Sequence, residues 1–239
     1  MKELRRIKSM RFLCHIPIIA LLMIGSSPEL VAQDWANLKR FQKENQQLSP
    51  PTAGESRVVL MGNSITEGWP KFYPEFFESS KYIARGISGQ TTPQMLLRFR
   101  QDVIDLKPDV VVILAGTNDI AGNTGPMSLD EIHGYIVSMC ELALANHIHV
   151  VLSSVLPAYE YPWKKEIQPA EKIVELNKML QGYAEANGIT YLDYFAPMAD
   201  SKNGLKQKYT YDGVHPNKTG YIKMSKLLKH ALKELSKGS

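Results

Sequence analysis

Four short stretches contain the residue types that nucleophilic attack on an acyl group requires. In the first, Ser64 follows the apolar run Val58–Met61 and the turn pair Gly62–Asn63. A serine hydroxyl is a poor nucleophile at neutral pH and needs a base within hydrogen-bonding distance. Taken alone, Ser64 is better explained as the cap of the helix that follows the strand, so a catalytic role depends on the other stretches.

The stretch YDGVHP contains a base and a partner for that base. Two residues separate Asp212 from His215, and Gly213 allows a tight turn between them. Such a turn can point both side chains toward one site, where the carboxylate fixes the tautomer of the imidazole. The alternative is a polar turn that caps the last helix, which explains Asp212 but gives His215 no role.

Two further stretches, RGISGQTT and AGTND, contain hydrogen-bond donors. Attack on an acyl carbon places negative charge on its oxygen, and preorganised donors there can each contribute roughly 3 to 4 kcal/mol. Candidate donors are the backbone N–H groups of Ser64 and Gly89 and the amide of Asn118. All three follow predicted strands, so a parallel sheet brings them to one edge. Each is ordinary in a turn, but the coincidence of four stretches favours a catalytic site.

Strands alternate with helices along the whole chain. The predicted strands cover residues 58–61, 82–85, 109–115, 149–154 and 190–192. The predicted helices cover residues 34–47, 92–106, 128–146, 169–187 and 217–235, with 69–77 irregular and then helical. The run DVVVILA lacks alternation, which is typical of a strand buried on both faces. This order predicts an α/β fold with an open, mostly parallel five-stranded sheet between helices.

The N-terminal 33 residues differ from the rest of the chain. A basic stretch precedes the apolar run Phe12–Gly25, which is short for a membrane span. The pattern predicts a signal peptide over 1–33, a helix and linker over 34–57 and a catalytic domain over 58–239. The mature protein is then exported, periplasmic or extracellular, without a membrane span; the alternative is a retained anchor.

Composition is ordinary for a soluble globular protein, with 44% hydrophobic and 22% charged residues in 239. Residues 1–33 hold five basic and two acidic side chains, so their removal lowers the net charge from +4 to about +1. A chain with so small a net charge has no electrostatic basis for binding nucleic acid or anionic membranes. Removal of Cys14 with the leader leaves Cys140 as a single cysteine, which we expect in the core.

Together the four stretches resemble the four sequence blocks of the SGNH hydrolases, also called GDSL-type esterases. The resemblance covers about Val58–Leu235 and implies a flavodoxin-like three-layer α/β/α sandwich. It also implies Ser64 as nucleophile, His215 as base and Asp212 as its orienting acid. The implied oxyanion hole consists of Ser64, Gly89 and Asn118. One departure is Asn63, which stands where the family usually has Asp and which carries no triad role.

An aromatic loop over residues 155–168 follows the fourth predicted strand at the same edge as these residues. Its aromatic faces could stack on sugar rings or cradle an acyl chain. The candidate substrate wall consists of Trp69, Tyr159, Tyr161 and Trp163. The alternative is a packed surface loop without a binding role.

The preferred function is that of a secreted serine esterase that removes small acyl groups, above all acetyl, from carbohydrates. The expected partner is its substrate, an ester of a small molecule, an oligosaccharide or a polysaccharide. Neither a metal nor an organic cofactor is implied. The pair His147 and His149 lacks the carboxylates or cysteines of a metal site. Alternatives are a lipid acylhydrolase or thioesterase of the same family and a non-catalytic glycan-binding module. The sequence leaves the oligomeric state open.

Overall fold

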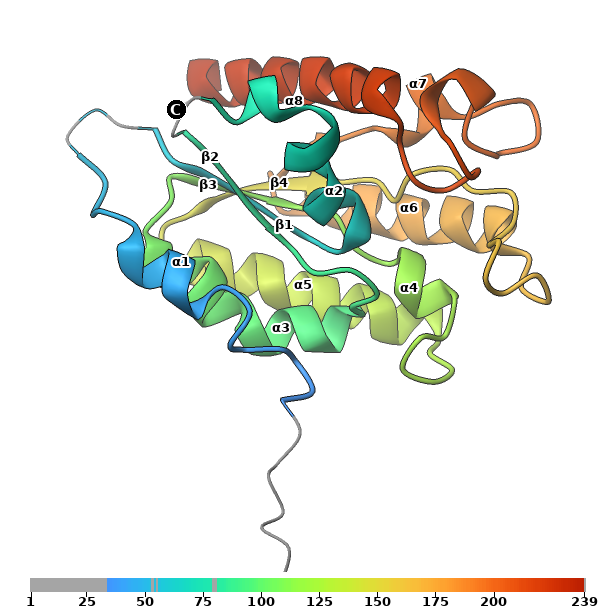
Figure 1. Ribbon diagram of the computed structural model, residues 1–239, viewed down its shortest axis with the longest axis horizontal. Coiled ribbons are helices and arrows are strands. Elements are labelled where there is room, and N and C mark those ends of the chain that lie inside the picture. Colours follow the sequence, from blue (N-terminus) through green and yellow to red (C-terminus); the bar gives the residue numbers. More distant parts are fainter. Residues whose placement is uncertain (1–33, 53, 55, 79–80, 239) are drawn as a thin grey trace, which may run out of the picture. The chain divides into compact units, whose positions relative to one another are not determined.

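A five-stranded parallel sheet runs through the part of the chain that the computed structural model describes, residues 34–52, 54, 56–78 and 81–238. The predicted signal peptide and Cys14 lie outside these residues. The strand order is β2-β1-β3-β4-β5, and each neighbouring pair is parallel (Figure 1). The strands are β1 (Val58–Gly62), β2 (Tyr82–Gly86), β3 (Val110–Ile113), β4 (His149–Ser153) and β5 (Thr190–Leu192). The predicted α/β sandwich is confirmed.

The strand order creates a switch point beside β1. The chain passes from β1 outward to β2 and then returns to β3 on the other side, so that Val58 is in register with both Tyr82 and Val110. In open parallel sheets, ligands bind outside the carboxyl ends of the strands at such a point. The residues that follow β1 and β3 are therefore placed where a site is expected.

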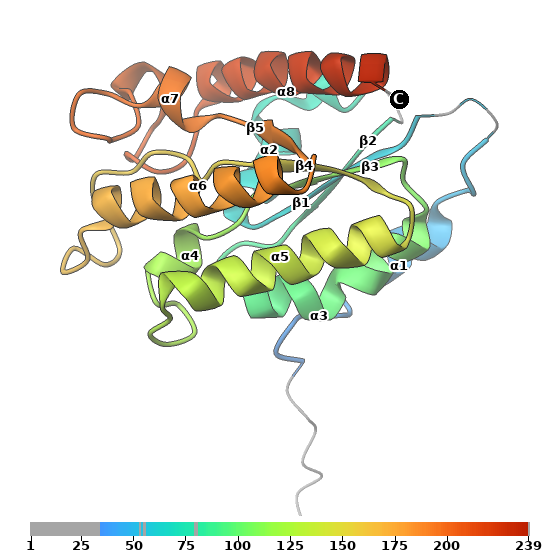
Figure 2. The same ribbon diagram turned by 180° about the vertical axis from the view of Figure 1, so that it is seen from behind.

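Both faces of the sheet are buried, as the missing alternation predicts. On β1, Val59 and Met61 face a cluster with the helices over 92–102 (α3), 129–145 (α5) and 169–186 (α6). Val58 and Leu60 face a cluster with the helices over 64–72 (α2) and 218–238 (α8). Figure 2 shows α8 along one face of the sheet and α3 and α5 along the other. Cys140 is fully buried in the first cluster, and burial raises the pKa of its thiol to about 12.

The helices agree with the prediction in their order but not always in their bounds. They are α1 (Gln42–Gln47), α2 (Ser64–Phe72), α3 (Thr92–Asp102), α4 (Thr117–Ile120), α5 (Leu129–Ala145), α6 (Pro169–Ala186), α7 (Phe195–Met198) and α8 (Lys218–Gly238). Short 3₁₀ turns cover Pro74–Phe76, Ile104–Leu106 and Gln207–Tyr209. Within the described residues, none of the helices has the length and apolar character that crossing a bilayer requires.

Two expected elements differ from the structure. The helix over 34–47 is reduced to α1, because its first part consists of turns. The segment over 69–77, expected to be irregular and then helical, instead contains the end of α2, which runs from Ser64 to Phe72, and then a 3₁₀ turn over Pro74–Phe76. A helix that starts directly after β1 gives Ser64 a fixed backbone, which bears on its chemistry.

Candidate active site

The predicted site residues lie just beyond the carboxyl ends of β1, β2 and β3 and in the loop before α8. Ser64 follows β1 after one residue and begins α2. Gly89 lies three residues after β2, and Asn118 lies in α4 beyond β3. Asp212 and His215 lie in the loop that enters α8. In Figure 1, α4 and the start of α8 both lie at the right-hand end of the sheet.

A continuous chain of hydrogen bonds joins Ser64, His215 and Asp212. Ser64 Oγ lies 3.0 Å from His215 Nε2, and His215 Nδ1 lies 2.6 Å from Asp212 Oδ2. Because an ionised carboxylate only accepts hydrogen bonds, these partners assign the imidazole proton to Nδ1. Nε2 is then left to accept from the serine hydroxyl, which is the arrangement that a general base requires.

The loop around Asp212 holds its carboxylate in place. Asp212 Oδ1 accepts hydrogen bonds from the backbone N–H of Val214 at 2.9 Å and of His215 at 2.7 Å. Gly213, with φ +90°, supplies the turn that brings both N–H groups around. Burial acts to raise the pKa of Asp212, but the hydrogen bonds from His215 and Val214 outweigh it, so the pKa lies below its ordinary value. The carboxylate therefore stays ionised beside the imidazole.

Ser64 does not cap α2, contrary to the simpler explanation of its position. The N-cap residue is Asn63, whose side chain makes no capping hydrogen bond, and the hydroxyl of Ser64 is directed to His215 instead. Asn63 is buried at 3% exposure, and its carbonyl accepts from the N–H of Glu67. The Ser64 N–H thus lies at the positive end of the α2 dipole, where negative charge is stabilised.

The other two candidate donors lie in the loops beside Ser64. The buried Asn118 amide donates one hydrogen to the carbonyl of Gln90 at 2.9 Å, which leaves its second hydrogen for another acceptor. Gly89 has φ +77°, and no atom lies within 4 Å of the place where a Cβ would stand. A substrate oxygen can therefore approach the Gly89 backbone without meeting a side chain.

Exposed aromatic rings flank His215. The Trp163 ring centroid lies 5.7 Å from that of the imidazole, and the side chain of Trp163 is 45% exposed. Tyr159, on the same loop, is 57% exposed. Both therefore present apolar surface to solvent on the aromatic loop, and Trp163 does so next to His215.

The prediction that Trp69 and Tyr161 belong to the substrate wall is wrong, because both rings are buried. Trp69 is 1% exposed because it packs against Phe76 and Tyr221 between α2 and α8. Tyr161 is fully buried, and its ring stacks under Trp163 with centroids 5.1 Å apart. Neither ring can contact a substrate; Tyr161 instead supports the exposed ring of Trp163.

Sequence reasoning missed Tyr211. Its ring stacks on the imidazole of His215 with an angle of 12° between the two ring planes, and Tyr211 is 56% exposed. The available indication was its place directly before Asp212 in the stretch YDGVHP. The imidazole thus has aromatic neighbours from two different loops, one carrying Trp163 and the other Tyr211.

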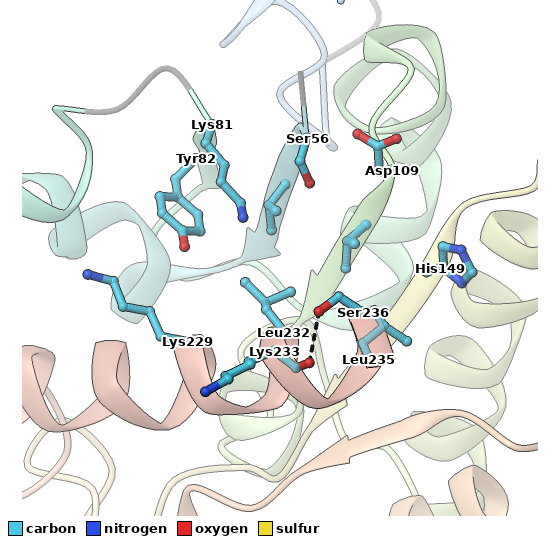
Figure 3. Close-up of a pocket in the computed structure, with 12 residues that line it drawn as sticks. Ser56, Lys81, Tyr82, Asp109, His149, Lys229, Leu232, Lys233, Leu235 and Ser236 are labelled. Carbon is cyan, nitrogen blue, oxygen red and sulfur yellow. Dashed lines mark hydrogen bonds between the residues drawn. The ribbon is translucent and has the colours of Figure 1, made fainter. Parts of the chain in front are cut away.

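A separate cavity of about 590 Å³ lies at the opposite edge of the sheet. It is lined by residues at the amino ends of the strands, among them Val58, Val110 and His149, and by the last turns of α8 (Figure 3). Because Ser64 follows the carboxyl end of β1, this cavity is not part of the candidate site. Within the described residues, no group of three or more His, Cys, Asp or Glu side chains is arranged to hold a metal ion.

Comparisons with known proteins place these features in one family. A GDSL-like lipase from Bacteroides thetaiotaomicron is 52% identical, with a TM-score of 0.82 over 84% of this chain and 98% of its own. A protein from Bacteroides fragilis is 50% identical with the same TM-score and the same two coverages. An acetylxylan esterase of Xylanibacter ruminicola is 26% identical over 220 residues, or 77% of this chain.

The chain spans about half of the length of two curated relatives, 44% of that esterase and 51% of another protein. The model of the GDSL-like lipase/acylhydrolase family matches residues 60–222. This match extends from β1 into α8 and includes every residue of the hydrogen-bond chain described above. The chain therefore belongs to the GDSL-like lipase/acylhydrolase family.

Proposed function

We propose that this hydrolase is a serine esterase in which Ser64 is the nucleophile, His215 the general base and Asp212 the residue that orients the base. The observation that carries the proposal is the hydrogen-bond chain from Ser64 Oγ through the imidazole to the Asp212 carboxylate. A hydrogen-bond chain of this kind is typical of an activated nucleophile, because a serine and a histidine that are exposed to water gain little stability from a fixed mutual geometry.

The reaction proceeds in two steps. In the first, Ser64 Oγ attacks the acyl carbon while His215 Nε2 takes its proton, and collapse of the tetrahedral intermediate expels the alcohol with that proton. In the second, His215 removes a proton from water, the hydroxide attacks the acyl-enzyme, and the carboxylic acid leaves as Ser64 regains its proton. The N–H groups of Ser64 and Gly89 and the Asn118 amide stabilise the oxyanion in both steps.

We further propose an acetyl group on a carbohydrate as the substrate. Trp163 and Tyr211 are exposed beside the base and offer apolar faces of the kind that stack on sugar rings. The acetylxylan esterase to which the chain is similar supports the same substrate class. An acylhydrolase or thioesterase of long-chain lipids and a non-catalytic glycan-binding module are the competing functions.

Export belongs to the same proposal. Residues 1–33 would act as the leader, residues 34–57 would form the N-terminal segment of the mature protein, and residues 58–239 would form the catalytic domain. Polysaccharide esters are encountered outside the cytoplasm, so export and the carbohydrate substrate support one another.

The test measures acetate release from a panel of acetylated polysaccharides by wild type and by Ser64→Ala. We expect release by wild type and none by the variant, because the variant lacks the nucleophilic oxygen. Hydrolysis of p-nitrophenyl esters of increasing chain length follows on the same samples. A marked preference for long chains would contradict the acetyl substrate. Inertness of folded wild type toward a fluorophosphonate probe would favour the glycan-binding module.

A further inference from the structure

Gln90 connects two of the three candidate oxyanion donors. It directly follows Gly89 in the chain, and its carbonyl accepts the hydrogen bond of the Asn118 amide at 2.9 Å. The Gln90 residue is 4% exposed, so it is placed behind the donors rather than beside a substrate. Any shift of the Gln90 backbone moves Gly89 through the covalent chain and turns the Asn118 amide through the hydrogen bond.

Two buried partners fix the side chain of Gln90. Its Oε1 accepts from Arg98 Nε at 2.6 Å, and its Nε2 donates to the carbonyl of Ala36 at 2.7 Å. Because Arg98 only donates and a carbonyl only accepts, the amide has one orientation that satisfies both. Gln90 is thus held between α3, which carries Arg98, and the N-terminal segment, which carries Ala36.

Arg98 connects this arrangement to the nucleophile. Its side chain is fully buried, and Nη2 donates to the carbonyls of Gly62 at 2.8 Å and of Arg85 at 3.0 Å. Gly62 ends β1 two residues before Ser64, and Arg85 lies near the end of β2. Asp102 pairs with Arg98 Nη1 at 3.0 Å, which compensates the buried positive charge.

We propose that Gln90 is a positioning residue for the oxyanion hole. It holds the Gly89 backbone and the Asn118 amide in register with Ser64, through Arg98 on one side and Ala36 on the other. The inference rests on the proposed function, because it assigns Gly89 and Asn118 to the oxyanion of an acyl transfer. The role is electrostatic preorganisation, which acts on the transition state more than on substrate binding.

The test compares Gln90→Leu and Gln90→Glu with the matched control Gln101→Leu. Gln101 also donates from Nε2 to a carbonyl of the N-terminal segment, that of Leu38, but among the described residues its side chain has no hydrogen bond to the loops of Gly89 and Asn118. Gln90→Glu keeps an acceptor for Arg98, whose positive charge pairs with the carboxylate, and replaces the donor to Ala36 by a second acceptor, so it serves if Gln90→Leu does not fold. The readouts are kcat and KM on p-nitrophenyl acetate and the rate at which a fluorophosphonate labels Ser64.

We expect Gln90→Leu to lower kcat and the labelling rate by about 10-fold or more, with KM within about 2-fold, since outright loss of one donor costs about 10²- to 10³-fold. Gln90→Glu should fall between Gln90→Leu and wild type, and Gln101→Leu should match wild type. Folded Gln90 variants with wild-type kcat, or losses equal to those of Gln101→Leu, would overturn the proposal.

Two outcomes for wild type separate this proposal from the proposed function. If a fluorophosphonate labels wild type but wild type releases no acetate from polysaccharides, only the proposed substrate fails. If wild type neither labels nor hydrolyses, the esterase function itself fails and the role of Gln90 with it.

Discussion

The ring of Tyr211 stacks on the imidazole of His215, with the ring centroids 5.9 Å apart and the planes 12° from parallel. Tyr211 also stacks on Phe72, which lies in α2, the helix that begins with Ser64. One side chain therefore contacts both the ring of the proposed base and the helix that begins with the proposed nucleophile. Stacking of this kind restricts rotation of the imidazole and helps to keep Nε2 directed toward the hydroxyl.

Replacing Tyr211 by Ala should therefore reduce activity on every ester, small or large. Aromatic pairs contribute about 0.5–1.5 kcal/mol beyond their buried area, so we expect kcat/KM on p-nitrophenyl acetate to fall by about 3- to 10-fold. Tyr211→Phe keeps the stack and loses only the hydroxyl, which makes it the matched control. Equal activities of Tyr211→Ala and Tyr211→Phe would show that the stack does not position the base.

Trp163 tests the carbohydrate substrate. Trp163→Ala removes an exposed ring beside His215, and we expect kcat/KM on acetylated xylo-oligosaccharides to fall by about 10-fold, from the loss of roughly 1–1.5 kcal/mol of stacking. On p-nitrophenyl acetate, which has no sugar, the loss should be smaller. Trp35→Ala is the control, since Trp35 is also 45% exposed but, unlike Trp163, does not pack its ring against His215. Equal losses on both substrates would argue against a sugar-stacking role.

The end of β2 fixes the start of α2 through Gly86. A Cβ at Gly86 would lie 2.1 Å from the N of Glu67 and 2.6 Å from the O of Asn63, both in the first turn of α2. Gly86→Ala should push this turn away, lower the free energy of unfolding by about 1–3 kcal/mol and reduce kcat by displacing Ser64.

The control for Gly86 is Gly182→Ala in the middle of α6, where no atom lies within 4 Å of an added Cβ. Alanine in a helix interior should raise the free energy of unfolding by about 0.5–1 kcal/mol. Urea denaturation and p-nitrophenyl acetate hydrolysis on the same samples separate the two effects. A Gly86→Ala protein as stable and active as wild type would rule out the close packing.

Local patterns predicted the sheet because its strands are short apolar runs buried on both faces, as Val58–Met61 and Val110–Ile113 are. The same reasoning placed the bounds of α2 wrongly, because α2 runs from Ser64 to Phe72 and contains Gly68 and Pro70, residue types that disfavour a helix interior. In the structure an added Cβ at Gly68 would lie 2.7 Å from the hydroxyl of Tyr221 in α8. A side chain at position 68 would displace this hydroxyl, so glycine is favoured by a contact between residues far apart in the sequence, which no local pattern contains.

The residues of the candidate site could be predicted from the sequence because each of them either follows a predicted strand or lies with its partner in one short loop. The distances of 3.0 and 2.6 Å join residues that the motifs already indicated. The side chains around them were not predictable, because their role depends on burial. Trp69 donates from its indole N–H to Ser225 of α8 at 3.2 Å, so an aromatic residue next to a motif became part of the core.

The pKa of Asp212 predicts the direction in which the stability of the fold changes with pH. An aspartate whose pKa is lower in the folded than in the unfolded chain stabilises the fold above its unfolded pKa of about 3.9. That contribution is lost as the pH falls through the folded pKa. Asp212 is of this kind, because the hydrogen bonds from His215 and Val214 outweigh the effect of burial on its pKa.

Asp212→Asn removes this titration and keeps the shape of the side chain. The difference in the free energy of unfolding between wild type and variant, measured by urea denaturation, should be largest near neutral pH and shrink as the pH approaches 3. At neutral pH kcat should fall by about 10³- to 10⁴-fold, because an amide can donate to Nδ1 and so favours the tautomer with the proton on Nε2. A difference in stability that is constant with pH would mean that the hydrogen bonds at Oδ1 and Oδ2 do not depend on the charge of the carboxylate. Full activity of the variant would mean that the tautomer of His215 does not depend on the carboxylate of Asp212.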